Sequence, residues 1–322
     1  MVAYTGIQGQ NILIVSSDPA NPTEGQIWYN STSNLLKGYA NVVTNAWASG
    51  GALNTGRGYL AGCGLQTAAV AFGGFLAPGN SAATELYNGT SWTSSGSMGT
   101  ARYYLGSAGT QTAALGFGGY ASGNSSAVES FNGTSWSPAT SMPVANRNFG
   151  STGTQTAAIA FGGVHSNITL LYNAPSWSTN PTSLNTYRVH TSGVGTQTAA
   201  LGFGGQIPGP NAASAATESF NGSTWTTLNS LNTARKYPGG SGTQTSALAY
   251  GGGPPNTGAT ELWNGTSWTS NPNSMGTARY AFASAGTQTL ALASGGRTGT
   301  NALTTTEEWT GASVQVRTIT TS

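Results

Sequence analysis

Charged side chains are scarce in this sequence. Its 322 residues include 10 Lys and Arg and 8 Asp and Glu, so only 6% of the chain is charged, whereas soluble domains average about 25%. This scarcity excludes a long amphipathic helix with ion-paired faces, and an aromatic content of 10% excludes the usual charged, aromatic-poor disordered chain. A net charge of +2 is too small for the basic face of a nucleic-acid-binding protein, so we expect no nucleic-acid partner.

Cysteine, histidine and aspartate are nearly absent. One cysteine, Cys63, cannot form an internal disulfide, and two His with one Asp leave few groups for metal binding or acid–base catalysis. We therefore expect no cofactor and no metal site. The opening segment MVAYTGIQGQNILIV lacks a basic region, and its apolar run is too short for a signal peptide or a membrane span. The sequence thus predicts neither secretory export nor a membrane-spanning segment.

Glycine is abundant, and it marks an internal repeat. The tetrapeptide GTQT or a close variant begins at six glycines 42 to 47 residues apart: Gly64, Gly109, Gly153, Gly195, Gly242 and Gly286. A Gly-Gly pair follows nine residues later each time, then an aromatic residue, and five residues after that a Trp, except that the last unit has Val314 there. The Trp positions are Trp92, Trp136, Trp177, Trp225 and Trp268. Such a period is typical of solenoids and propellers.

Each unit has the pattern of four short strands. A strand follows a recurrent Arg, a second carries the alternating AALGFGG sequence, and the third and fourth are joined by Asn-Gly, a strong hairpin signal. No segment has a sustained helical period. Because one four-stranded unit cannot bury both faces alone, radial stacking into an all-β β-propeller is predicted.

The order Gly-Gly, aromatic, Trp, Arg resembles the kelch repeat over residues 51–320. The GTQT turn, the low charge, Leu170 and Val314 depart from that pattern. The resemblance implies a propeller with the first strand of each blade innermost, but no activity, because kelch propellers serve enzymes, adaptors and adhesins alike. Copper radical oxidases of the galactose oxidase type also resemble kelch propellers, but their His, Tyr and Cys ligand set is not matched here.

The domain prediction separates residues 1–50 from residues 51–322. The latter supply six clear repeats, because WTGASV at 309–314 aligns with YNGTSW and gives the sixth unit its own fourth strand. Residues 1–50 contain four strand-like runs ending in Trp47, which lies at the repeat distance from Arg57. We interpret them as a divergent seventh blade, in preference to a separate attachment module, so seven blades are favoured over six.

Most of the charge occupies repeat positions. The recurrent Arg and the Glu two residues before the aromatic are predicted to pair within or between blades, because unpaired buried charge is costly. Leu170 replaces Glu in the third unit, so either Arg147 or Arg188 should lack this partner. The periodic Trp residues are expected to pack between blades, and Cys63 is expected to fill a narrow place near the axis. The charged positions are Arg57, Arg102, Arg147, Arg188, Arg235, Arg279, Glu85, Glu129, Glu218, Glu261 and Glu307.

Loop length varies on only one face of the predicted propeller. From Gly-Gly to the Glu position the spacing ranges from 7 to 13 residues, while the other two turn types hardly change. Variable loops on one face often form a binding surface, although neutral drift of exposed loops explains the variation equally well. The candidate binding residues on this face are Phe75, Leu76, Asn80, Tyr120, Asn124, His165, Gln206, Ile207, Pro254, Asn256, Arg297 and Asn301.

The segment DPANPTEGQIWYNSTSNLLKGYANVVTNAW resembles a short strand meander of bacteriophage structural proteins. The resemblance implies a virion component made in the host cytoplasm, with other virion proteins as partners. We expect a non-enzymatic tail-fibre or surface-decoration protein that presents its loops to host surface glycans, and a homo-oligomer is compatible with this role. Two alternatives remain: a kelch-type adaptor, which usually carries a helical oligomerisation module, and a carbohydrate-active propeller enzyme, which would need a pair of free carboxylates.

Overall fold

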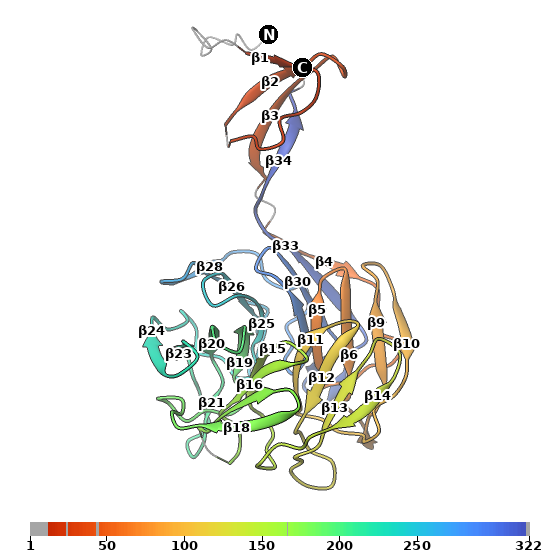
Figure 1. Cartoon of the computed structure of the whole chain (residues 1–322), viewed down its shortest axis with the longest axis vertical. Helices are drawn as coiled ribbons and strands as arrows, with labels where there is room; N and C mark the ends of the chain where they lie inside the picture. Colours follow the sequence, from red (N-terminus) through yellow and green to blue (C-terminus); the bar gives the residue numbers. More distant parts are fainter. Residues whose placement is uncertain (1–11, 24, 43–44, 166, 320–322) are drawn as a thin grey trace. The chain divides into compact units, whose positions relative to one another are not determined.

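A computed structural model describes residues 12–23, 25–42, 45–165 and 167–319 of the chain (Figure 1). All regular elements in these ranges are β-strands. The chain divides into two compact units, which are described separately. The propeller comprises Ala46–Thr310, and the end module combines Met1–Asn45 with Gly311–Ser322.

The propeller contains six antiparallel four-stranded blades, and the inner strands β5, β11, β15, β19, β25 and β29 contact one another in a closed ring. From the inner strand outward, blades one to three are β5 (Ala61–Leu65), β6 (Ala68–Phe72), β9 (Thr84–Tyr87), β10 (Trp92–Ser95); β11 (Gly106–Thr110), β12 (Ala113–Phe117), β13 (Val128–Phe131), β14 (Trp136–Ala139); and β15 (Gly150–Gly153), β16 (Ala157–Phe161), β17 (Thr169–Asn173), β18 (Ser176–Asn180).

Blades four to six are β19 (Ser192–Gly195), β20 (Ala200–Phe203), β23 (Thr217–Phe220), β24 (Trp225–Leu228); β25 (Gly239–Gly242), β26 (Ala247–Tyr250), β27 (Thr260–Trp263), β28 (Trp268–Asn271); and β29 (Ala283–Gly286), β30 (Leu290–Ser294), β33 (Thr306–Thr310), β4 (Ala46–Gly50). Three short hairpins extend the loops between the second and third strands: β7–β8 (Phe75–Leu76, Gly79–Asn80), β21–β22 (Gln206–Ile207, Ala212–Ala213) and β31–β32 (Arg297–Thr298, Asn301–Ala302). The prediction of an all-β propeller is confirmed.

The sixth blade is completed by the N-terminal side of the propeller. Strand β4 pairs with β33, so that Trp47 lies opposite Trp309. The prediction that the sixth unit supplies its own outer strand is therefore wrong: β34 (Ser313–Thr318) pairs instead with β3 (Leu35–Val42) in the end module. Seven blades were also predicted wrongly, because the ring closes on six. Closure by an N-terminal strand gives the sixth blade the same number of strands as the other five.

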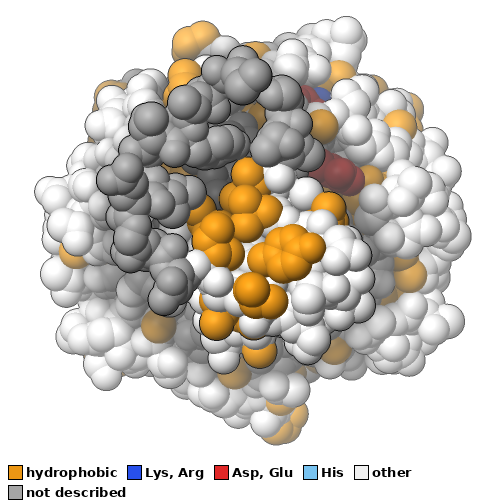
Figure 2. All heavy atoms as spheres, turned by 90° about the horizontal axis from the view of Figure 1, so that it is seen from above, with side chains coloured by type: hydrophobic (Ala, Val, Ile, Leu, Met, Phe, Trp, Pro, Cys, Tyr) orange, Lys and Arg blue, Asp and Glu red, His pale blue; other side chains and the backbone are white. Residues whose placement is uncertain are grey.

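The end module is a four-stranded sheet in the order β1 (Leu13–Val15), β2 (Ile27–Asn30), β3, β34. The Asp18 carboxylate accepts hydrogen bonds from the Trp28 indole at 3.1 Å, the Asn30 amide at 2.8 Å and the Lys37 ammonium at 2.8 Å. Large hydrophobic side chains are exposed on this module at Ile12, Leu13, Ile14, Ile27 and Leu35, and hydrophobic side chains gather in the foreground of Figure 2. Three of the four strand-like runs of the predicted seventh blade, β1 to β3, thus belong to a separate unit, and the fourth, β4, completes blade six.

Neighbouring blades are joined by the repeat Trp and by the Gln of GTQT. The Trp136 ring of blade two packs against Phe72 of blade one at 4.7 Å, and its indole donates to Thr84 at 2.8 Å. The Gln111 amide of blade two donates to the carbonyl oxygens of Ala69 and Tyr87 in blade one. Five further Gln residues make the same pair of bonds to the preceding blade: Gln66, Gln155, Gln197, Gln244 and Gln288.

Five blades contain the predicted buried Arg–Glu pair. In each, the guanidinium also donates to two backbone carbonyls of its own blade, as Arg57 does to Gly73 and Ala83. Burial lowers the pKa of these arginines and the partner Glu opposes that effect, as for Arg57 beside Glu85. The pairs are Arg57–Glu85, Arg102–Glu129, Arg188–Glu218, Arg235–Glu261 and Arg279–Glu307. Every guanidinium charge is therefore compensated where it is buried.

Blade three replaces both members of the pair. Asn146, not Arg147, occupies the position 16 residues before Gly-Gly, and its amide donates to the Gly162 carbonyl at 2.9 Å. Leu170, 1% exposed, fills the place of the Glu. Arg147 was assigned to the repeat position by counting residues from Trp136. This assignment was wrong because the number of residues between the Trp and the Arg varies by one from unit to unit. Arg147 instead lies one residue further along, outside the structural set.

Candidate functional site at the mouth of the central channel

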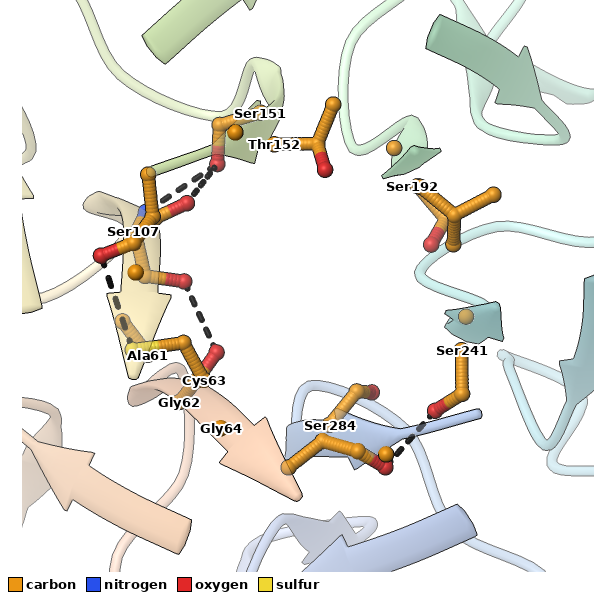
Figure 3. A pocket seen from close by; sticks show the side chains of 18 of the residues that line it. Ala61, Gly62, Cys63, Gly64, Ser107, Ser151, Thr152, Ser192, Ser241 and Ser284 are labelled. Atoms are coloured by element: carbon orange, nitrogen blue, oxygen red, sulfur yellow. Dashed lines mark hydrogen bonds between the residues drawn. The ribbon is translucent and has the colours of Figure 1, made fainter. Parts of the chain in front are cut away.

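The inner strands of the propeller line a central cavity, which we call the lumen. Its volume is about 290 Å³, and small residues surround it: among them Gly62, Cys63, Ser107, Ser151, Thr152, Ser192, Ser241 and Ser284 (Figure 3). Cys63 lies in this wall, as predicted, and burial raises the pKa of its thiol to about 12. At neutral pH the thiol is therefore protonated and a poor nucleophile.

Hydroxyl groups of the lumen wall mostly bond to the neighbouring blade. Ser107 donates to the Gly62 carbonyl at 2.8 Å, Thr152 to the Gly195 carbonyl at 2.8 Å, and Ser241 to the Ala285 carbonyl at 2.8 Å. These bonds join inner strands that share no β-ladder. The hydrogen-bonding groups of the wall are thus largely satisfied within the protein.

One end of the lumen carries a ring of residues in left-handed backbone conformation, which we call the mouth. Each blade contributes one residue with φ between 51° and 61°: Tyr59, Tyr104, Asn148, His190, Tyr237 and Ala281. Backbone hydrogen bonds run between them, from Tyr104 N to Tyr59 O at 3.0 Å and from Tyr59 N to Ala281 O at 2.7 Å. Because this conformation costs about 1–2 kcal/mol for a residue with a side chain, such residues cluster where function requires them.

Four mouth residues form an aromatic cluster. The His190 and Tyr237 rings stack with centroids 3.7 Å apart, Tyr59 and Tyr104 lie 4.5 Å apart, and Tyr104 contacts His190 at 5.5 Å. The cluster continues outward through Tyr280, which lies 5.6 Å from Tyr237. The apolar ring faces of such a cluster can pack against apolar parts of a ligand, and the polar atoms at the ring edges can form hydrogen bonds with its hydroxyl groups.

Beneath the mouth lies a cavity of about 120 Å³. A second ring, the collar, forms the boundary between this cavity and the lumen, because its six members line both: Leu60, Leu105, Phe149, Thr191, Pro238 and Phe282. Thr191 is 7% exposed, and its Oγ1 has no hydrogen-bond partner within the described structure; the same holds for Asn148 Oδ1. Two buried polar atoms at this cavity thus remain available to a ligand.

The mouth has a positive electrostatic environment. Burial, together with the nearby charges of Arg147 and Lys236, lowers the pKa of His190 to about 3, so the imidazole is neutral at neutral pH. Burial raises the pKa of Tyr237 to about 12, while Arg147 opposes that shift. Among the residues that line the mouth cavity and the lumen there is no Asp or Glu.

Four predicted binding residues border the mouth. Phe75, Tyr120, Gln206 and Arg297 form β-bridges with Gly58, Tyr103, Val189 and Tyr280, each of which directly precedes a mouth residue. The Arg297 guanidinium lies 5.4 Å above the Tyr59 ring. The structure thus brings part of the variable-loop face and the mouth together.

The other predicted residues lie further along the same loops. Leu76 and Asn80 belong to the β7–β8 hairpin, Ile207 to β21 and Asn301 to β32. Asn80 donates to the Ala121 carbonyl of blade two at 2.9 Å. The remaining residues are Asn124, which bridges to Tyr120, and His165, Pro254 and Asn256, whose side chains are exposed.

Sequence reasoning missed the mouth itself. Its residues stand 14 positions before each Gly-Gly pair, but only three of the six are Tyr, so no residue type recurs there. The available signal was the pair YY at 103–104 with single Tyr residues at the same place in blades one and five. Left-handed backbone at a Tyr is not readable from sequence, because Gly, Asn and Asp are the usual markers.

The described residues contain no helix, and hence none of the length and apolarity needed to cross a membrane. They also contain no group of three or more His, Cys, Asp or Glu arranged to hold a metal ion.

Comparison with known proteins supports the fold. No protein-family model and no curated protein sequence matches the chain. Among solved structures, that of YjhT matches with a TM-score of 0.66 and 15% sequence identity, covering 83% of this chain and 99% of the YjhT chain. At this identity the likeness concerns the fold alone, and the chain has the β-propeller-like fold of YjhT.

Proposed function

We propose that the protein is a non-enzymatic bacteriophage virion component whose propeller binds carbohydrate of the host surface at the mouth. The observation that carries this proposal is the aromatic mouth on the variable-loop face. Tyr59, Tyr104 and Tyr237 offer ring faces and hydroxyl groups, and neutral His190 adds a further polar ring. Saccharides have apolar ring faces edged with hydroxyls, and a concave site with aromatic walls and few polar groups matches that chemistry.

The virion assignment is supported by the sequence of the end module, which resembles a strand meander of phage structural proteins. The exposed hydrophobic side chains of this module, including Ile14 at 70% exposure, support its use as an attachment surface for other virion proteins. Mass spectrometry of phage particles from a host that carries the gene tests this part: the protein should co-purify with tail or capsid proteins.

The mouth offers substitutions that keep the backbone conformation and can be used to test carbohydrate binding. Asn148 and Ala281 occupy mouth positions with the same backbone conformation as the Tyr residues, so an Asn fits there. Tyr59→Asn, Tyr104→Asn and Tyr237→Asn should each weaken glycan binding by about 5- to 10-fold, the loss of one aromatic contact of roughly 1 kcal/mol. Ala281→Asn is the matched control, because it changes the same ring without removing an aromatic side chain.

A glycan array with the full chain provides the measurement. Binding that is retained by Ala281→Asn and lost by the triple Tyr variant supports the proposal. Binding that the triple variant retains would move the site away from the mouth and contradict it, as would an array without any glycan bound by the unsubstituted protein.

A further inference from the structure

Three cations border the mouth. Arg147 directly precedes the mouth residue Asn148 of blade three, and Lys236 directly precedes Tyr237 of blade five. Blade four, which supplies His190, lies between these two blades in the ring. Arg297 lies over Tyr59. Within the described structure none of the three forms a salt bridge, whereas the paired cations of the propeller are all buried in their blades.

The described acids are all engaged elsewhere. Five Glu residues pair with the structural arginines, Asp18 pairs with Lys37, and Glu308 accepts a hydrogen bond from Tyr87. The charges that act on His190 at the mouth are Arg147 and Lys236. The mouth is therefore a local region of uncompensated positive charge in a nearly neutral protein, which attracts anions.

Unpartnered polar atoms gather at the same place. The structure has six buried side-chain nitrogen or oxygen atoms without a hydrogen-bond partner among the described residues: Arg102 Nε, Arg147 Nε, Asn148 Oδ1, Arg188 Nε, Thr191 Oγ1 and Ser294 Oγ. Three of these lie in blades three and four: Asn148 belongs to the mouth, Thr191 belongs to the collar, and Arg147 directly precedes Asn148. The Arg147 guanidinium lies 4.6 Å above the Tyr120 ring, a contact that holds it without using its donors.

We propose that the ligand of the mouth is an anionic saccharide whose carboxylate, sulfate or phosphate group binds between Arg147 and Lys236. This inference rests on the proposed carbohydrate function and specifies its ligand class. The guanidinium supplies donors for an oxyanion, Lys236 supplies a point charge, and Arg297 adds charge beyond Tyr59. Thr191 and Asn148 supply acceptors for sugar hydroxyls, and the Tyr–His cluster supplies the faces against which a sugar ring packs.

The test compares polysaccharides that differ in charge and in the charged group. The full chain is titrated by biolayer interferometry with neutral dextran, dextran sulfate, polygalacturonate and phosphorylated dextran, and with inorganic polyphosphate as an anion without sugar. One or more anionic saccharides should bind at least tenfold more tightly than dextran, with affinity that falls as salt increases. The three anionic polymers distinguish sulfate, carboxylate and phosphate as the bound group.

Matched variants assign that binding to the mouth. Arg147→Gln and Lys236→Gln should each weaken it by about tenfold, as expected when one charge-assisted contact is removed. Arg147→Lys should retain part of the affinity because it keeps the charge. Thr112→Glu lowers the net charge by one at the exposed turn between β11 and β12 and should leave binding unchanged. Thermal melting of each variant shows whether it folds.

Each outcome bears on one of the two proposals. Binding of neutral and anionic polymers that depends on the mouth Tyr residues but not on Arg147 or Lys236 overturns the anionic ligand and leaves the carbohydrate function in place. Polyphosphate binding equal to that of the anionic saccharides, insensitive to the Tyr→Asn variants, overturns the carbohydrate function. Binding lost equally in Thr112→Glu shows a non-specific charge effect and overturns the site.

Discussion

The side-chain amide of Gln197 in blade four donates to the carbonyl oxygen of Tyr172 in blade three at 2.6 Å, and a second bond from the same nitrogen reaches Ala158 at 3.1 Å. Equivalent pairs occur at all six blade junctions, which explains why GTQT recurs. The turn of one blade holds two middle strands of the blade before it. The repeat motif is thus an inter-blade contact as well as a turn.

Replacing Gln197 by Leu should lower the free energy of unfolding by about 2–4 kcal/mol. The substitution leaves two carbonyl oxygens without these donors at a buried position, and an unsatisfied buried polar group costs about 1–3 kcal/mol. Denaturant unfolding provides the measurement. Thr198→Ala, in the same turn and exposed, is the control and should change stability by no more than about 0.5 kcal/mol. Equal effects of the two substitutions would contradict a junction role for the Gln.

The buried ion pair of blade two should be replaceable by the pair of residues found in blade three. Arg102→Asn leaves Glu129 buried without its cation and should destabilise the protein by about 3–5 kcal/mol. Combining it with Glu129→Leu reproduces the Asn146 and Leu170 arrangement and should recover at least about half of that loss. A double-mutant cycle by denaturant unfolding measures the coupling. Simple additivity of the two substitutions would mean that the pair is not energetically coupled.

Ala281 at the mouth should be improved by glycine. Its φ of 55° lies in the left-handed region, where a Cβ is unfavourable, so Ala281→Gly should raise stability by about 0.5–1 kcal/mol. Ala283→Gly, in strand β29, should instead lower stability by a similar amount because glycine loses more conformational freedom there. Thermal melting of both variants checks the opposite signs, and a shared sign would argue against backbone strain at the mouth.

The end module should lose stability in acid through Asp18. Its hydrogen bonds with Lys37, Asn30 and Trp28 lower the pKa of its carboxyl from 3.8 to about 2. Because the folded-state pKa is lowered, the stabilisation is fully present above about pH 4 and is lost as the pH falls through 2. The indole NH resonance of Trp28 reports the transition by NMR. Asp18→Asn should remove this pH dependence, and an unchanged titration in that variant would assign it to another group.

Much of the propeller followed from local sequence signals. The period of GTQT, Gly-Gly and Trp predicted the four-stranded unit and its repetition, because Asn-Gly turns and alternating strands are encoded within a few residues. The buried Arg and Glu positions were also visible, since burial without a partner is costly. The exception at Arg147 arose where a connection changed length by one residue, and only the 16-residue spacing to Gly162 identifies Asn146 as the structural residue.

The sequence by itself determined the repeating strands, the charged architecture and the face on which loop length varies. Only the tertiary structure decided the blade number, because ring closure pairs β4 with β33, strands separated by nearly the whole chain. It also decided the site. Tyr59, Tyr104, His190 and Tyr237 come from four blades, and no recurring residue type marks the repeat position that they share. They meet because the closed ring brings the beginnings of the six inner strands together around a common axis, and each mouth residue lies just before one of these strands.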